Sequence, residues 1–412
     1  MALTLAGDFA KGALDGTPMG EKVIARMQDP ARPMPPPSMG LPRPSAADLT
    51  VMQDWVAGGA KGVNGSACAE TTSETDGPAW ASADWPEDEC EQVITIGAHE
   101  TNGTPFVDDP QGFPVPSEET YYHCFYEKMP WGDKPMQALA IRARVETPDD
   151  LQLLHHMQLS SLGARDSVSL FGAPRPTQNG QHQPCANPNG ATIGTWGPGA
   201  LNPVTVPDDV GVMMPTGANP YLEMQVHYHN PKHESGKRSR TSFDVCVTSK
   251  LRENTAAIHT LGFENSFEGM ISVFAGVVPR LDYKDEGVAV GVCTAKERAR
   301  LLSIAPHMHE LGRHSKVELL RADGSIRVLH DQAFDFNNQT SYLFDDLWIE
   351  RGEKIRTTCT WDPNQRPIVF GFSSKDEMCF MSTLAYPAGA LSGRGDEKGW
   401  AGGDMSCAGQ GE

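Results

Sequence analysis

The chain has 412 residues, of which 39% are hydrophobic and 21% charged, a balance typical of folded domains and not of disordered chains. The net charge of −19 argues against nucleic acid and anionic membrane surfaces as partners. No stretch approaches the roughly 20 consecutive apolar residues of a membrane span. The length is sufficient for two or three domains, and 41 glycines with 32 prolines predict many turns between short strands.

Residues 1–62 are predicted to be mostly helical. Ser45, a residue type typical of the N-cap, precedes a segment with apolar side chains at helical spacing: Leu49, Met52, Trp55 and Val56. Arg32-Pro-Met-Pro-Pro-Pro lies before this segment, and glycines 58 and 59 follow it.

This arrangement resembles the C-terminal half of a small c-type cytochrome domain, in which the loop methionine, here Met34, is an axial haem ligand. The chain has no Cys-x-x-Cys-His attachment motif. We therefore interpret residues 1–62 as a remnant or truncation of such a domain that cannot hold covalent haem. A proline-rich leader with a docking helix is the alternative.

Nine cysteines are scattered singly, at positions 68, 90, 124, 185, 246, 293, 359, 379 and 407. None has Cys-x-x-Cys spacing, so they indicate disulfides formed in an oxidising compartment, with at least one thiol left over. The sequence from Met1 lacks the basic and apolar regions of a signal peptide. We therefore expect a periplasmic or secreted protein whose present sequence begins inside a longer chain.

Residues 63–89 are small, polar and acidic and are predicted to be a linker. From Cys90 onward the pattern predicts a mainly β chain of two tandem antiparallel jelly-roll β-sandwich domains. With a boundary near residues 249–257, these domains are 90–252 and 253–412. Strands are expected at 93–96, 121–126, 137–145, 221–228, 242–248, 271–274, 288–292, 315–320, 326–329 and 354–361.

Histidines suited to metal binding occur in three motifs of these two halves. His307 and His309 are separated by one residue, and on a strand such residues point to the same face, where two imidazoles can bind one metal ion. His155 and His156 are adjacent, and His227 follows Gln-Val. Each motif is weak alone, because histidines are often core or surface residues. Nearby histidines could compete as ligands: His229, His233 and His314.

Met378 lies in Asp-Glu-Met-Cys, and alone it would be read as a packing residue. The ordered set His-His, Gln-Val-His-Tyr, His-x-His-x-Leu-Gly and Glu-Met-Cys resembles the copper type II, ascorbate-dependent monooxygenases over roughly residues 90–412. The resemblance implies two facing copper ions separated by a wet cleft, one in each jelly roll. It also implies ascorbate as reductant, or a cytochrome if a haem domain precedes this sequence.

Carried over to this chain, the resemblance assigns an electron-transfer copper to His155, His156 and His227. It assigns a second, O₂-binding copper to His307, His309 and Met378, which would be the catalytic residues. Three imidazoles tolerate both Cu(I) and Cu(II), whereas a thioether favours Cu(I). Gln225, near the first copper in the family, is retained.

The resemblance also implies disulfide pairs. Cys124 would pair with Cys185, and Cys359 with Cys379, which would lock the segment of Met378. Cys293–Cys407 would tie the C-terminus back to the second domain. Cys90 could form a disulfide with either Cys68 or Cys246, and this choice stays open.

Two positions depart from the peptide-amidating members of the family. Ala305 replaces an arginine that grips a substrate carboxylate, and Ser382 replaces a substrate-binding tyrosine. Loss of the bidentate partner makes a peptidylglycine carboxylate a poor substrate, and with Phe380 these residues indicate a less polar pocket.

We therefore predict hydroxylation of an sp³ C–H bond of a small, weakly polar substrate, using O₂ and two electrons. A non-catalytic copper-binding or sensing protein on the same scaffold is the main alternative, and a carbohydrate-binding pair of jelly rolls is a weaker one.

Overall fold

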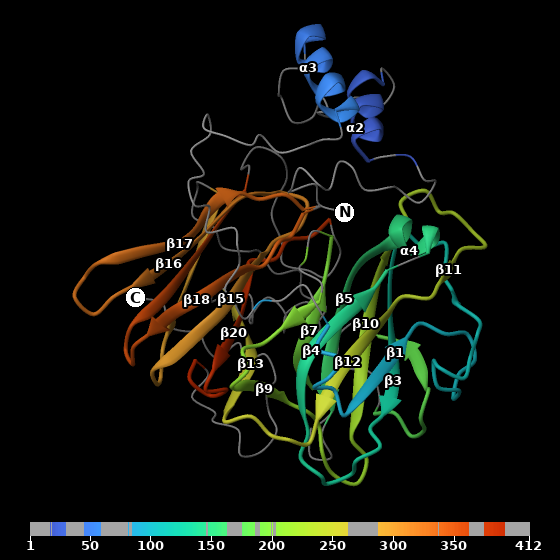
Figure 1. The fold of residues 1–412 in the computed structure, drawn as a ribbon, viewed down its shortest axis with the longest axis vertical. Coiled ribbons are helices and arrows are strands. Elements are labelled where there is room, and N and C mark those ends of the chain that lie inside the picture. The colour runs from blue at the N-terminus through green and yellow to red at the C-terminus, as the bar shows by residue number, and fades with distance from the viewer. Residues whose placement is uncertain are drawn as a thin grey trace. The chain divides into compact units, whose positions relative to one another are not determined.

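The computed structural model describes residues 17, 19–29, 45–58, 81, 85–145, 147–162, 175–185, 190–198, 200, 203–262, 287–336, 338–361 and 375–391. The chain divides into two compact units, residues 1–75 and 76–412. The first contains helices α2 and α3, and the second contains the strands (Figure 1). No helix in these described ranges is long and apolar enough to cross a membrane.

The first unit contains α2 (Met19–Gln28) and α3 (Ala46–Ala57). Ser45 caps α3 as predicted: its hydroxyl accepts from the Asp48 backbone, and the Asp48 carboxylate accepts from the Ser45 backbone. The partly buried residues of α3 are the predicted apolar ones: Leu49, Met52, Trp55 and Val56. Met34 and most of the linker predicted at 63–89 lie outside the described residues, so the cytochrome interpretation stays a prediction.

The second unit is built from strands, which confirms the mainly β prediction. The predicted strands coincide with observed ones, except that 271–274 lies outside the described residues. The elements are β1 (Gln92–Gly97), β2 (Phe113–Pro114), β3 (Thr120–Lys128), β4 (Gln137–Arg144), α4 (Pro148–Leu153), β5 (Leu154–Leu162), β6 (His182–Pro184), β7 (Ala191–Trp196), β8 (Val204–Thr205), β9 (Val210–Met213), β10 (Tyr221–His229), β11 (Arg238–Ser239), β12 (Ser242–Thr248), β13 (Asn254–Gly262), β14 (Val288–Thr294), β15 (Ala299–His307), β16 (Gly312–Leu320), β17 (Ile326–Ala333), β18 (Tyr342–Ile349), β19 (Lys354–Trp361) and β20 (Phe380–Tyr386).

Each half is a β-sandwich. In the first half, β1, β12, β4 and β9 face a five-stranded sheet of order β6-β3-β10-β5-β7. Residues of both sheets, such as Phe243 and Val226, share one apolar core. In the second half, β20, β15 and β18 face a four-stranded sheet of order β14-β19-β16-β17. Leu301 and Val317 meet in a second core there. Alternating apolar residues on each strand supply these cores.

One sheet continues from the first half into the second. β13 pairs in parallel with β9 and antiparallel with β20, so the sheet has the order β1-β12-β4-β9-β13-β20-β15-β18. Leu302 on β15 and Leu384 on β20 pack into the core of the first half. The predicted boundary falls at the start of β13, and the division into 90–252 and 253–412 stays a prediction.

Three disulfides join described residues. Cys124–Cys185 and Cys359–Cys379 confirm the predicted pairs. Cys90 pairs with Cys246, which resolves the open choice. Cys293 is also disulfide-bonded, and its predicted partner, Cys407, lies outside the described residues. Each bridge contributes about 2–4 kcal/mol in the loop-entropy model.

Candidate metal centres

The first candidate centre depends on a β-bulge in β5. His156 lies opposite His227 of β10, whereas Leu154 lies opposite Tyr228, so His155 is an extra residue without a partner in the ladder. Adjacent residues on a regular strand point to opposite faces. The bulge lets two adjacent histidines turn towards one point, where His227 meets them.

The three rings present their Nδ1 atoms to one another. The Nδ1 atom of His155 lies 3.0 Å from that of His156 and 3.2 Å from that of His227. One ligand nitrogen from each ring lies within 4.8 Å of the others. Since metal–imidazole bonds are about 2.0–2.1 Å long, two nitrogens bound to one ion lie roughly 3 Å apart. The observed spacing therefore fits a metal ion held by His155, His156 and His227.

These rings are neutral. Burial lowers the pKa of His155 to about 3 and holds the pKa values of His156 and His227 well below the ordinary range, with mutual repulsion of the imidazoles acting in the same direction. One proton on the Nδ1 atom of His155 can point to only one of its two neighbours. A metal ion would satisfy all three lone pairs at once.

Aromatic rings hold the first centre in place. Tyr122 stacks on His227 with ring centroids 4.1 Å apart and planes 13° from parallel. Phe336 stacks on His155 at 4.5 Å. The Nε2 atoms of His155 and His227 are buried and have no hydrogen-bond partner among the described residues. Packing therefore orients these imidazoles more than hydrogen bonds do.

The second candidate centre lies where β15 ends. His307 is the last residue of β15, and His309 lies beyond it in a turn closed by a Gly312 N–H to the His309 carbonyl oxygen. The expectation of two histidines on one strand is therefore wrong for His309. The rings are nevertheless close, with centroids 5.2 Å apart. The backbone N–H of His309 donates to Glu377 and does not pair with a neighbouring strand.

Hydrogen bonds orient both rings of the second centre. The Nδ1 atom of His307 lies 2.6 Å from the Gln339 Oε1 atom. The Nε2 group of Gln339 donates to the Phe336 carbonyl oxygen, so the Oε1 atom is the one that faces His307. The Nδ1 atom of His309 lies 3.2 Å from the Asp376 carbonyl oxygen, which can only accept. Since both Nδ1 atoms donate, the Nε2 atoms carry the lone pairs that a metal needs.

Glu377 joins His309 to the segment that carries Met378. Its buried carboxylate accepts from the backbone N–H groups of His309 and Leu311 and from the indole of Trp361, at 3.1, 2.6 and 2.8 Å. Burial raises the pKa of Glu377 to about 7, against these hydrogen bonds, which lower it. Met378 follows directly, is 9% exposed, and belongs to an apolar cluster with Met308 and Trp361.

The two centres are neighbours. The ring centroids of His156 and His307 lie 6.3 Å apart. Phe336 contacts both centres, at 4.5 Å from His155 and 6.4 Å from His309. Phe336 follows β17 and packs beside the rings of both centres, and the wet cleft that the resemblance implies stays a prediction.

The comparisons with known proteins agree with this geometry. The family model of the copper type II ascorbate-dependent monooxygenase N-terminal domain matches residues 109–235, and that of the C-terminal domain matches residues 273–392. Together they cover more than half of the chain. The chain belongs to this family. Copper and ascorbate are accordingly the cofactor and reductant that its family membership implies.

The chain is also similar to curated members of this monooxygenase family. Dopamine beta-hydroxylase of Rattus norvegicus is 24% identical over 288 residues, covering 66% of this chain and 44% of the relative. DBH-like monooxygenase protein 1 of Gallus gallus is 27% identical over 300 residues, covering 66% and 45%. Tyramine beta-hydroxylase of Caenorhabditis briggsae is 27% identical over 288 residues, covering 67% and 47%. The chain thus spans less than half the length of these relatives.

The possible competing histidines lie in different settings in this member of the family. His229 follows His227 on β10, and its ring centroid is 6.2 Å from that of His155. His233 lies 2.9 Å from the Ser117 carbonyl oxygen, and His314 pairs with Asp331 at 3.1 Å. His233 and His314 are therefore engaged elsewhere.

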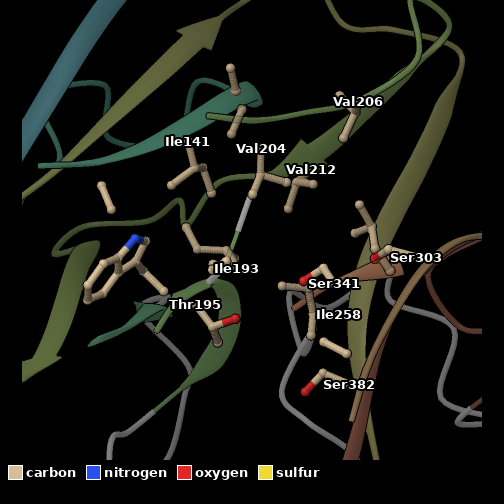
Figure 2. Close-up of a pocket in the computed structure, with 18 of the residues that line it drawn as sticks. Ile141, Ile193, Thr195, Val204, Val206, Val212, Ile258, Ser303, Ser341 and Ser382 are labelled. Atoms are coloured by element: carbon tan, nitrogen blue, oxygen red, sulfur yellow. The ribbon is translucent and has the colours of Figure 1, made fainter. Parts of the chain in front are cut away.

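The predicted pocket residues separate. Ala305 and Ser382 line a mainly apolar pocket, and Ser382 is labelled in Figure 2. Phe380, which was predicted to join them, packs instead against the cluster that contains Met378. Gln225 is buried on β10, two residues before His227.

Sequence reasoning missed four residues of these centres: Tyr122, Phe336, Gln339 and Glu377. Glu377 could have been noticed as an acid directly before a candidate ligand. Tyr122, two residues before Cys124, carries no such signal. Phe336 and Gln339 come from a loop whose position beside the histidines depends entirely on the tertiary fold.

Proposed function

We propose that this chain is a two-copper monooxygenase that hydroxylates an sp³ C–H bond of a small, weakly polar substrate with O₂ and two electrons. The observation that carries the proposal is the convergence of the Nδ1 atoms of His155, His156 and His227. A second, hydrogen-bonded histidine pair lies directly beside them. When bound, copper supplies the one-electron chemistry and O₂ activation for which side chains alone are unsuited.

In this proposal, His155, His156 and His227 hold the electron-transfer copper. Their low pKa values keep the rings neutral, so that no proton competes for the lone pairs in the neutral pH range. Three imidazoles suit both oxidation states of copper. Tyr122 and Phe336 keep water from one face of the rings by stacking on them.

His307, His309 and Met378 would hold the second copper, which would supply the O₂ chemistry next to the bound substrate. Gln339 and the Asp376 carbonyl oxygen hold the two imidazoles in the tautomer with the lone pair on Nε2. Glu377, directly before Met378, accepts a hydrogen bond from the His309 backbone. Cys379, directly after Met378, is joined to Cys359 of β19 by a disulfide. The soft thioether of Met378 favours Cu(I), the oxidation state that reacts with O₂.

The electrons come from ascorbate in this proposal, or from a cytochrome, as the resemblance of residues 1–62 suggests. The disulfides belong to an oxidising compartment, and we propose a periplasmic or secreted location. Small-molecule substrate and O₂ are the remaining partners.

Oxygen consumption by the copper-loaded protein tests this function. We expect ascorbate-dependent O₂ uptake that increases with a suitable substrate and disappears when a chelator removes copper. A protein that binds copper and consumes no O₂ with ascorbate or a cytochrome donor would instead be a copper-binding or sensing protein.

A further inference from the structure

An apolar pocket lies between the two halves of the second unit. It provides about 790 Å³ of empty space, part of it open to solvent. Side chains from the first half form one wall, among them Ile141, Ile193 and Val212 (Figure 2). Ile258 of β13, Ser303 of β15 and Ser382 of β20 form the opposite side.

One row of side chains leads from this pocket to the second centre. Ser303, Ala305 and His307 alternate along β15 and therefore share one face of the strand. Ser382 lies directly opposite Ala305 on β20. Ala305 precedes His307 by two residues, or roughly 7 Å along a strand. The pocket wall is thus continuous with the strand that presents His307.

The chemistry of the lining is uncharged. No Asp, Glu, Lys, Arg or His is among the described residues that line the pocket. Its polar side-chain groups are hydroxyls and the indole N–H of Trp196. Within the described part of the chain, four of the hydroxyls make no hydrogen bond to protein: Thr195, Ser303, Ser341 and Ser382. A charged ligand group would lose its hydration here without gaining an opposite charge, and this costs far more than burying a hydroxyl that finds a partner.

We propose that this pocket binds the substrate, and that the substrate is an uncharged molecule with an apolar body and one alcohol or ketone group. The apolar wall covers the body, and the serine hydroxyls bind the polar group. A C–H bond of the bound molecule then faces the His307 end of β15. This inference rests on the proposed function and adds the substrate class to it.

The test is equilibrium binding to the full chain, loaded with Cu(II) and kept without reductant so that no turnover occurs. Four probes share one skeleton: 2-phenylethanol, ethylbenzene, phenethylamine and phenylacetate. We expect 2-phenylethanol to bind at least about tenfold more tightly than the amine or the carboxylate, because each of these must desolvate a charge. Ethylbenzene should bind several-fold more weakly than the alcohol. Equal or tighter binding of the amine or carboxylate overturns the inference.

Two substitutions locate the binding in this pocket. Ala305→Arg places a guanidinium opposite Ser382, and it should reverse the preference so that phenylacetate binds more tightly than 2-phenylethanol. Ile193→Trp should fill the space and weaken binding of 2-phenylethanol and ethylbenzene alike, so it tests the location even if the arginine variant fails to fold. Ser325→Ala, in the exposed β16–β17 turn, is the matched control and should bind like the unaltered chain. Unchanged binding in a folded Ile193→Trp protein overturns the assignment.

Ascorbate-dependent O₂ uptake is measured separately on the same samples. Normal uptake with a preference for the charged probes rejects the pocket inference and leaves the proposed function intact. Absence of uptake with the expected probe order rejects the proposed function and leaves an apolar binding site.

Discussion

The two candidate centres hold their histidines by different means. At the first, a β-bulge brings His155 and His156 to His227, and the rings are fixed by stacking with Tyr122 and Phe336. At the second, hydrogen bonds to polar groups orient His307 and His309 at the end of β15. The first set presents Nδ1 atoms, and the second presents Nε2 atoms.

This difference indicates where each centre is vulnerable. An imidazole held by packing depends on neighbouring ring volumes, whereas one held by a hydrogen bond depends on a single acceptor that also selects its tautomer. In the proposed function, the second centre adds the thioether of Met378 on a different segment, and Glu377 and a disulfide secure that segment. Substitutions of ligands and orienting groups should therefore affect one centre at a time, and substitution at a remote ion pair should affect neither.

Removal of a whole centre gives the largest effect. His155→Ala combined with His156→Ala removes two of three ligands from the first centre, and the second centre should keep its copper because its ligands lie on other segments. Elemental analysis should show a fall from two copper ions per chain to one. His233→Ala with His314→Ala, at histidines engaged elsewhere, is the control and should keep both. Two equivalents in the first variant would show that the first centre is misassigned.

Removal of the thioether should affect the second centre alone. Met378→Ile conserves volume and should cost under about 1.5 kcal/mol of stability. Turnover should nevertheless fall by more than the roughly 10–100-fold that follows loss of an outer hydrogen-bond partner. X-ray absorption of the reduced protein should lose its Cu–S contribution, while the first copper is reduced normally.

Met381→Ile is the control for that experiment, since Met381 is a fully buried core residue of β20. It should retain turnover and the Cu–S signal. If Met378→Ile consumed O₂ at the unaltered rate, Met378 would be a packing residue only.

Removal of an orienting group should have a smaller effect. Gln339→Leu deletes the acceptor at the Nδ1 atom of His307, and copper affinity at the second centre should fall by about 10–100-fold. Competition with a chelator, in a chain that also carries His155→Ala and His156→Ala, measures this centre in isolation. Gln339→Glu keeps an oxygen acceptor and should restore most of the affinity. Equal affinity of the leucine variant would show that the hydrogen bond does not orient the ring.

The smallest effect on the two centres is expected from a substitution that lies away from both. Burial raises the pKa of Asp244, but hydrogen bonds from Arg142, Thr95 and Arg144 outweigh it and lower that pKa overall. A lowered carboxyl pKa stabilises the fold above the unfolded-state value of about 3.9, and this contribution is lost as the pH falls through the folded-state value. Asp244→Asn should therefore cost about 1–3 kcal/mol at pH 7, and the difference should shrink below about pH 4.

Denaturant unfolding at several pH values measures this difference. Copper content should stay unchanged, which would separate fold stability from the two centres. Asp88→Asn, at an exposed turn position, should leave stability unaltered. A constant difference between Asp244→Asn and the parent across the acid range would contradict the assigned ion pairs.

The sequence alone determined the features that depend on local pattern. Alternation of apolar residues predicted nine of the twenty strands in the described residues, including β3, β4, β10 and β12, because the period of a strand is two residues. The N-cap Ser45 was equally readable. The family resemblance, added to the histidine motifs, supplied the proposed members of the two centres, and it supplied the pairs Cys124–Cys185 and Cys359–Cys379.

Only the tertiary structure decided how those residues meet. A bulge is set by the pairing of two strands, so the sequence His155-His156 could not show that both rings face His227. Strand pairing also ends at His307, because the His309 N–H donates to the carboxylate of Glu377, which lies on a distant segment. Cys246 became the partner of Cys90 because β1 and β12 pair. Phe336 and Gln339 reach the centres from a loop, and no local period specifies where a loop packs.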